Sequence, residues 1–231
     1  MGMRPRRAAA HNEDMAVIDR LMLVAAMVGL AAGAQRGMSA ESAEEWIPLF
    51  DGRSLAGWKE PPFLTPGKVE VKDGTIVLGR GRMTGITWTG EFPRSGYEIR
   101  FEAARLEGKD YFAGITFPVK EEHCSWVSGG WDGTVVGLSN VDGYDASENE
   151  TSAAREFESG RWYQFRLAVT EKRIRAWIDG EVVVDLETAA RKFGLPFGES
   201  DLSAPLGFSS YGTKAGLRKV EYRRLSGEPA R

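Results

Sequence analysis

The stretch GRWYQFRLAVTEKRIRAWIDGEVVVD, residues 160–185, predicts three consecutive β-strands. Apolar side chains occupy every second position of its first part, at Tyr163, Phe165, Leu167 and Val169. That period of two is typical of a strand with one buried face. A polar turn follows, and the alternation resumes at Ile174, Ala176 and Ile178. Asp179-Gly180 predicts a tight hairpin because glycine readily adopts the positive φ that such turns require. The stretch therefore indicates an antiparallel meander and an all-β protein.

The rest of the chain repeats this pattern of short strands and turns. Between residues 46 and 225 we expect about a dozen strands, separated by glycine- and proline-rich turns at the spacing of a β-sandwich. A chain of 231 residues has room for one domain with a sizeable core. The fold class that we predict is an all-β sandwich of two antiparallel sheets.

Composition limits the classes of partner and of site. Charged residues make up 27% of the chain and the formal net charge is -3, so we expect no nucleic-acid partner. Cys124 is the only cysteine, which excludes an intramolecular disulfide. The sequence holds 2 histidines, His11 and His123, and seven tryptophans that must be either core or stacking surface.

The first residues are typical of a secretory signal peptide. The apolar run from Leu21 to Ala34 is shorter than the ~20 residues of a membrane span, and Ala32-Gly33-Ala34 forms an A-x-A cleavage site. The long segment before this run holds Glu13, Asp14 and Asp19, which are unusual in a signal peptide, and translation from Met15 would remove most of that oddity. We predict a signal peptide over 1–34, a flexible linker over 35–44 and one domain over 45–226. The mature protein would be periplasmic or extracellular, with no membrane span. A buried helix or a membrane anchor is the alternative for the apolar run.

Several motifs resemble one bacterial family. They are WIPLFDGRSLAGW at 46–58, VKDGTIV at 71–77, GYEIRFE at 96–102, GRWY at 160–163, AWIDG at 176–180, LGF at 206–208 and LRKVEYRRL at 217–225. Their order and spacing are similar to those of the 3-keto-disaccharide hydrolases, long known as domain of unknown function 1080. The resemblance covers about Trp46 to Leu225.

That resemblance implies a jelly roll like that of concanavalin-type lectins and glucanases, together with export and carbohydrate chemistry. It also implies that a base removes the C2 proton of a sugar oxidised at C3, after which the glycosidic oxygen at C1 leaves and water adds. No nucleotide cofactor is implied. The family carries a histidine just before its last strands, and Tyr211 stands near that position in this sequence.

The candidate catalytic residues are therefore His123, Asp132 and Tyr211. His123 survives signal cleavage and has an unperturbed pKa near neutrality, as a general base requires. A lone histidine at a strand start is also compatible with a structural role. Asp132 would complete a polar cleft.

Aromatic residues supply candidate sugar-binding platforms: Trp126, Trp131, Tyr144 and Trp177. Trp177 is expected on the outer face of its strand, where a tryptophan needs either a cover or a ligand. The alternative for each ring is a place in the core.

The acidic middle segment supplies a candidate metal site. Asp142, Asp145 and Glu148 offer oxygen ligands at close spacing, suited to Ca²⁺ or another divalent metal, including a transition metal. Surface turns are the alternative for these three residues. Glu148 and Glu150 are the nearest approach to a glycosidase carboxylate pair, although they also suit a solvated turn.

Three hypotheses follow. The first is an exported enzyme, monomeric or a small homo-oligomer, that hydrolyses or eliminates the glycosidic bond of 3-keto-glycosides. The second is a non-catalytic carbohydrate-binding or adhesion module on the same fold. The third is a purely structural exported domain, since a fold does not fix a function.

Overall fold

The computed structural model describes residues 45–196 and 198–226. The predicted signal peptide and linker lie outside the described residues. The described part of the chain is a sandwich of two antiparallel sheets with one short 3-10 helix, η1 (Ser200–Ser203). It contains no helix that is long and apolar enough to cross a membrane.

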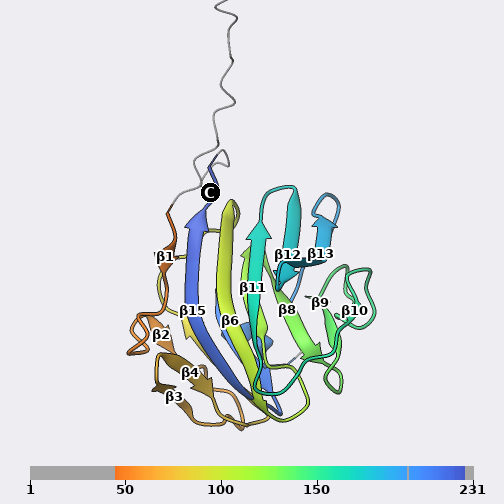
Figure 1. Cartoon of the computed structure of the whole chain (residues 1–231). Coiled ribbons are helices and arrows are strands. Elements are labelled where there is room, and N and C mark those ends of the chain that lie inside the picture. Colours follow the sequence, from red (N-terminus) through yellow and green to blue (C-terminus); the bar gives the residue numbers. More distant parts are fainter. Residues whose placement is uncertain (1–44, 197, 227–231) are drawn as a thin grey trace, which may run out of the picture. The chain divides into compact units, whose positions relative to one another are not determined.

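The first sheet has eight strands. In spatial order they are β13 (Glu181–Glu187), β12 (Arg173–Ile178), β11 (Trp162–Val169), β6 (Tyr97–Glu107), β15 (Lys214–Arg224), β4 (Thr75–Leu78) and β3 (Val69–Lys72), with β1 (Ile47–Pro48) also paired to β15. The long strands β15, β6 and β11 lie side by side (Figure 1).

The second sheet has seven strands. In spatial order they are β10 (Ala153–Ala154), β9 (Val135–Ser139), β8 (Glu122–Gly130), β7 (Gly114–Val119), β14 (Gly207–Tyr211), β5 (Met83–Trp88) and β2 (Trp58–Lys59). Because β7 and β14 are neighbours, residues about a hundred positions apart in the sequence share one surface.

The meander that the sequence predicts at residues 160–185 is confirmed. Tyr163, Phe165, Leu167 and Val169 are buried while the intervening side chains of β11 are not. Asp179 and Gly180 both have positive φ, 52° and 82°, as a primed hairpin turn requires.

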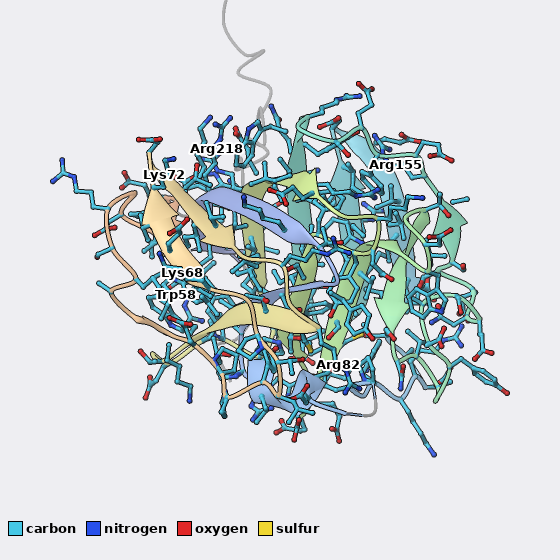
Figure 2. The ribbon with its side chains drawn as sticks, turned by 90° about the horizontal axis from the view of Figure 1, so that it is seen from below. Trp58, Lys68, Lys72, Arg82, Arg155 and Arg218 are labelled. Atoms are coloured by element: carbon cyan, nitrogen blue, oxygen red, sulfur yellow. The ribbon has the colours of Figure 1, made fainter. Side chains whose placement is uncertain are left out.

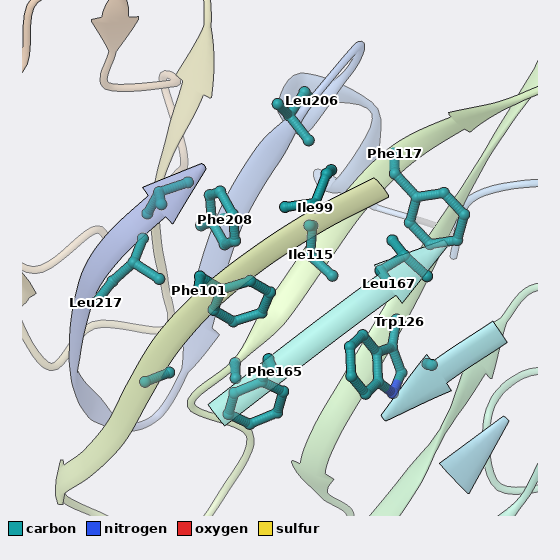
Figure 3. Close-up of a cluster of buried hydrophobic side chains, with 14 of the residues drawn as sticks. Ile99, Phe101, Ile115, Phe117, Trp126, Phe165, Leu167, Leu206, Phe208 and Leu217 are labelled. Carbon is teal, nitrogen blue, oxygen red and sulfur yellow. The ribbon is translucent and has the colours of Figure 1, made fainter. Parts of the chain in front are cut away.

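The core fills the space between the sheets with interlocking rings. Phe101 of β6 and Phe165 of β11 stack with centroids 4.9 Å apart, and Phe208 of β14 meets Phe101 edge-on at 4.9 Å. Trp126 of β8 contacts Phe165 at 5.5 Å, so side chains from both sheets interdigitate (Figure 3). This core leaves the alternate residues of β7, β8 and β14 free to face outward.

Candidate active site

The outer face of the seven-stranded sheet forms the floor of a cavity of about 460 Å³. Strand alternation decides which residues face it. On β7, Ile115 and Phe117 enter the core, while Gly114 and Thr116 face outward. Neighbouring strands add three serines and a valine, and the floor consists of Gly114, Thr116, Ser125, Val127, Ser139 and Ser209.

Strand register places the floor hydroxyls next to one another. Ser125 is the cross-strand partner of both Thr116 and Ser139, and its Oγ lies 2.9 Å from Oγ1 of Thr116. Ser209 is paired with Gly114. The floor therefore presents a row of small hydroxyl groups, which can donate and accept hydrogen bonds.

Aromatic rings form one wall of the cavity. The rings of Tyr111 and Tyr211 stack with centroids 6.0 Å apart and an angle of 27° between their planes, and the Tyr211 N–H donates to the Tyr111 carbonyl at 3.0 Å. Trp131 also lines the cavity and remains 45% exposed. Such accessible faces suit a sugar ring, whose C–H groups pack against aromatic surface.

Tyr111 lies over Gly114. A Cβ atom at position 114 would lie 2.9 Å from Cε2 of Tyr111 and 3.0 Å from Oγ of Ser209, so only glycine leaves space for the ring. Burial around its hydroxyl raises the pKa of Tyr111 to about 12, against a smaller opposing effect of the Ser209 hydrogen bond. Tyr111 therefore remains a neutral hydrogen-bond donor at physiological pH.

Two carboxylates reach the cavity from loops. Asp145 accepts hydrogen bonds at Oδ1 from the Ser147 N–H (2.8 Å) and the Ser147 hydroxyl (2.6 Å). Glu199 accepts at Oε1 from the Leu64 N–H, which joins two loops at the edge of the cavity. Arg82 adds a cation to the lining (Figure 2).

Asn149 and Thr151 fix the loop that carries Asp145. The Asn149 amide donates to the carbonyls of Asp145 (2.6 Å) and Leu138 (2.7 Å). Thr151 Oγ1 accepts from the Leu138 N–H at 2.8 Å. Because Leu138 precedes Ser139 on β9, these bonds hold Asp145 beside the floor.

Arg105 fixes the turn that carries Trp131. Its buried guanidinium donates from Nη2 to the Gly133 carbonyl at 2.8 Å and lies 5.3 Å from the ring centroid of Phe112. Trp131 and Asp132 both have positive φ in this turn. Arg105 thus acts as a positioning residue for the Trp131 wall.

A second hollow of about 580 Å³ adjoins the cavity across Tyr211. Arg80, Lys109, Asp110 and Asp132 line it. Burial raises the pKa of Asp110, and the charge of Asp132 adds to this effect. Asp132 therefore belongs to this neighbouring hollow and does not line the main cavity.

The structure brings together only some of the predicted site residues. Tyr211, Trp131 and Asp145 line the main cavity. His123 is half-buried on β8, paired with Pro118, and is not in the cavity lining. Burial and then the charge of Arg94 lower its pKa. Tyr144 is 58% exposed in a turn closed by a bridge to Val141.

Two predicted platforms lie elsewhere. Trp126 is fully buried in the core because even positions of β8 point inward, which corrects its assignment as a sugar platform. Trp177 lies on the outer face of the other sheet, under the Arg166 guanidinium at 3.7 Å from its ring centroid. The expected outer-face position is confirmed, and the cover is an arginine.

The predicted metal ligands do not converge. Asp142 pairs with Arg191 at 2.7 Å and accepts from the Lys192 N–H at 2.9 Å, while Glu148 is exposed. Within residues 45–196 and 198–226, no group of three His, Cys, Asp or Glu side chains is arranged to hold a metal ion. The trio of Asp142, Asp145 and Glu148 is therefore corrected to one cavity residue and two surface residues.

Sequence reasoning missed Tyr111, Glu199 and the floor hydroxyls. Tyr111 follows a polar turn with no recognisable motif, and Glu199 sits in a loop between Pro196 and Pro205. Part of the floor can be predicted from the sequence, because Thr116, Ser125 and Ser209 are polar residues that interrupt apolar runs at the outward positions of strands.

Comparison with known proteins gives a family and a fold. The family model described as a 3-keto-alpha-glucoside-1,2-lyase-like domain matches residues 45–226. Among curated proteins, no match to the sequence was found.

Similar solved structures share the sandwich at low identity. A proposed glycosyl hydrolase from Parabacteroides distasonis has a TM-score of 0.53 at 15% identity, covering 78% of this chain and 94% of its own. The Crh5 transglycosylase in complex with NAG has a TM-score of 0.54 at 14% identity, covering 81% and 87%. A non-specific endo-beta-1,3(4)-glucanase, SCLam, has a TM-score of 0.54 at 11% identity, covering 79% and 91%. These likenesses establish the concanavalin-like fold.

Proposed function

Because the chain belongs to the 3-keto-alpha-glucoside-1,2-lyase-like domain family, we propose that it cleaves the glycosidic bond of 3-keto-glycosides. One observation carries the proposal: a single cavity combines the Asp145 carboxylate with the protonated Tyr111 hydroxyl over a floor of small hydroxyls. A base and a neutral donor are the two groups that elimination next to a ketone requires.

The proposed reaction starts at C2 of the sugar. The C3 ketone acidifies the C2 proton, and Asp145 takes that proton through Oδ2, since its recorded hydrogen bonds from Ser147 use Oδ1. The electron pair left at C2 moves into the C2–C3 bond and gives an enolate with its charge on the C3 oxygen. Tyr111 donates a hydrogen bond to that oxygen.

Collapse of the enolate completes the cleavage. The C3 carbonyl reforms, the electron pair makes a C1–C2 double bond, and the C1–O bond breaks with its electrons on the leaving oxygen. That oxygen takes a proton, and the Asp145 carboxylic acid is a suitable source. Addition of water, with hydroxyl at C1 and a proton at C2, gives net hydrolysis.

The remaining lining residues suit sugar binding. Tyr211 and Trp131 offer ring faces at the wall, and Thr116, Ser125 and Ser139 offer hydroxyls at the floor. A carbohydrate is therefore the proposed ligand. The described donor set does not fit a metal-centred site, and we assign no step to a metal ion.

The test is release of the aglycone from a chromogenic 3-keto-glucoside, with the unoxidised glucoside as substrate control. We expect Asp145→Asn to lower turnover by about 10²-fold or more and Tyr111→Phe by about 10²–10³-fold. Asp142→Asn is the matched control, because Asp142 pairs with Arg191 outside the cavity lining.

The same assay in the presence of a chelator distinguishes a reaction that needs the predicted divalent metal from one that the protein side chains carry out alone. Turnover that persists in chelator supports Asp145 and Tyr111 as the acting groups. Turnover that a chelator abolishes, or that Asp145→Asn leaves unchanged, would contradict the assignment.

A carbohydrate-binding module is the second candidate function. The six floor residues, Gly114, Thr116, Ser125, Val127, Ser139 and Ser209, include no ionisable side chain, so the floor itself supplies no acid or base. A folded protein that binds the 3-keto-glucoside and releases no aglycone would favour this candidate.

We also propose that residues 1–34 direct export to the periplasm or the exterior. The apolar run and the A-x-A site support this proposal. N-terminal sequencing of the protein from the culture medium or periplasm should start after Ala34, or after Ala40 if the second small-residue site is used. An intact N-terminus on the secreted protein, or retention in the cytoplasm, would contradict export by cleavage.

A further inference from the structure

The outer face of the eight-stranded sheet carries a third hollow, of about 700 Å³. It lies on the side of the molecule opposite the candidate active site. Figure 2 shows Arg218 of this face and Arg82 of the main cavity on opposite sides. Four cationic side chains line the hollow, namely Arg100, Arg166, Lys219 and Arg223, against two carboxylates, Glu102 and Glu221.

Two of these arginines are direct cross-strand neighbours. Arg100 of β6 is the register partner of Arg166 of β11. Like charges directly opposite each other destabilise a sheet. The paired carboxylates lie to either side, because Arg100 donates from Nε to Glu221 at 2.6 Å and Arg166 donates from Nη1 to Glu98 at 2.9 Å. No described carboxylate forms an ion pair with both arginines.

Tryptophan rings hold the guanidiniums in place. Arg166 lies 3.7 Å from the ring centroid of Trp177, and both Arg100 (4.1 Å) and Arg223 (4.5 Å) lie over Trp46. Cation–π stacking fixes the plane of a guanidinium and leaves its N–H edge free to donate. The side-chain entropy that normally opposes binding by arginine is thus already reduced.

The side chains of the hollow carry a net positive charge even when Glu98, a buried acid beneath them, is included. Glu98 is 3% exposed and pairs with both Arg166 and Arg223. Counting it, the lining still has one cation in excess. An anionic group placed between Arg100 and Arg166 would meet two guanidinium edges and relieve their mutual repulsion.

We propose that this hollow binds the anionic groups, carboxylate or sulfate ester, of an acidic polysaccharide. The interspersed carboxylates favour this occupant over other polyanions. Glu102 and Glu221 can accept hydrogen bonds from sugar hydroxyls beside the anionic group. The phosphate groups of a nucleic acid or of an anionic membrane are acceptors alone, and these carboxylates repel them. The proposal does not rest on the reaction in the main cavity.

Calorimetric titration of the protein tests the proposal. The probes are polygalacturonate for carboxylate, dextran sulfate for sulfate ester, neutral dextran as control, and phosphatidylglycerol vesicles for a lipid surface. The wild type should bind an acidic polymer, not neutral dextran, and binding should weaken with added salt.

The decisive variant is Arg100→Gln with Arg166→Gln. We expect it to bind the acidic polymer at least about ten-fold more weakly. Arg173→Gln with Arg175→Gln is the matched control, because these arginines lie on the same sheet, pair with Asp185 and are not in the hollow lining. It removes the same charge and should change affinity by less than about two-fold.

Circular dichroism and the melting temperature check that each variant is folded. If the double variant does not fold, Arg100→Gln alone serves, since the Arg100 side chain is exposed. Equal binding by wild type and the folded variant, binding of vesicles in place of polysaccharide, or no binding of either acidic polymer would overturn the proposal.

Discussion

At the scale of the residue, the contact between Gly114 and Tyr111 connects the sheet to the proposed chemistry. Gly114 interrupts the side chains on the outer face of β7, and the ring of Tyr111 occupies the resulting space. The same ring stacks with Tyr211 at 6.0 Å. The absence of one side chain therefore determines where a proposed hydrogen-bond donor stands.

Replacement of Gly114 by Ala should displace Tyr111. The added Cβ would lie 2.9 Å from the ring and 3.0 Å from Ser209 Oγ, and relief requires a shift of a rigid ring. We expect the free energy of unfolding to fall by about 1–3 kcal/mol, with turnover reduced as in Tyr111→Phe. Urea denaturation followed by circular dichroism measures the first effect.

Gly194→Ala is the matched control for this substitution. A Cβ at Gly194 would have no atom within 4 Å, and its φ is not positive. Equal stability of the two variants would show that the cavity wall adapts and that Gly114 is not required for the Tyr111 position.

At the scale of the element, the sequence predicts those structures that depend on interactions between residues close together in the chain. The β11–β12–β13 meander is determined by the local alternation of apolar and polar residues and by the Asp179-Gly180 turn, so the sequence predicts it. The loop of Asp145 is held by Asn149 through bonds to Leu138, eleven residues away, which no local pattern reveals.

The aromatic wall shows the same limit. Arg105 and Gly133 are 28 residues apart and meet only because β6 and the turn after β8 pack together. Tyr111 and Tyr211 meet across a hundred residues. The sequence predicts that Tyr211 and Trp131 are functional candidates. Which other residues line the cavity with them, such as Tyr111, depends on the tertiary fold. Trp126 and Trp131 are five residues apart, yet strand alternation places Trp126 in the core and the turn after β8 leaves Trp131 at the surface.

At the scale of the whole molecule, the two outer faces of the sandwich have different chemistry. The seven-stranded sheet presents hydroxyls and rings, and the eight-stranded sheet presents stacked arginines and carboxylates. One core supports both faces, since alternate residues of every long strand point inward. Any change in global stability therefore affects both proposed sites together.

His123 should make that global stability depend on pH between about 7 and 5. Burial lowers its pKa below the ordinary value of 6.5 in the folded state, and the Arg94 charge adds to this effect. As pH falls through 6.5, the unfolded state takes up a proton that the folded state resists, so the free energy of unfolding should decrease. His123→Gln should flatten this decrease in a series of thermal melts.

Asp185→Asn is the control. The hydrogen bond from Arg175 lowers the pKa of the Asp185 carboxyl below its ordinary value of 3.8, so any pH dependence that Asp185 contributes lies at more acidic pH than that of His123. A wild-type melting temperature that is constant from pH 7 to 5, or a His123→Gln curve with the wild-type slope, would show that His123 does not carry the dependence.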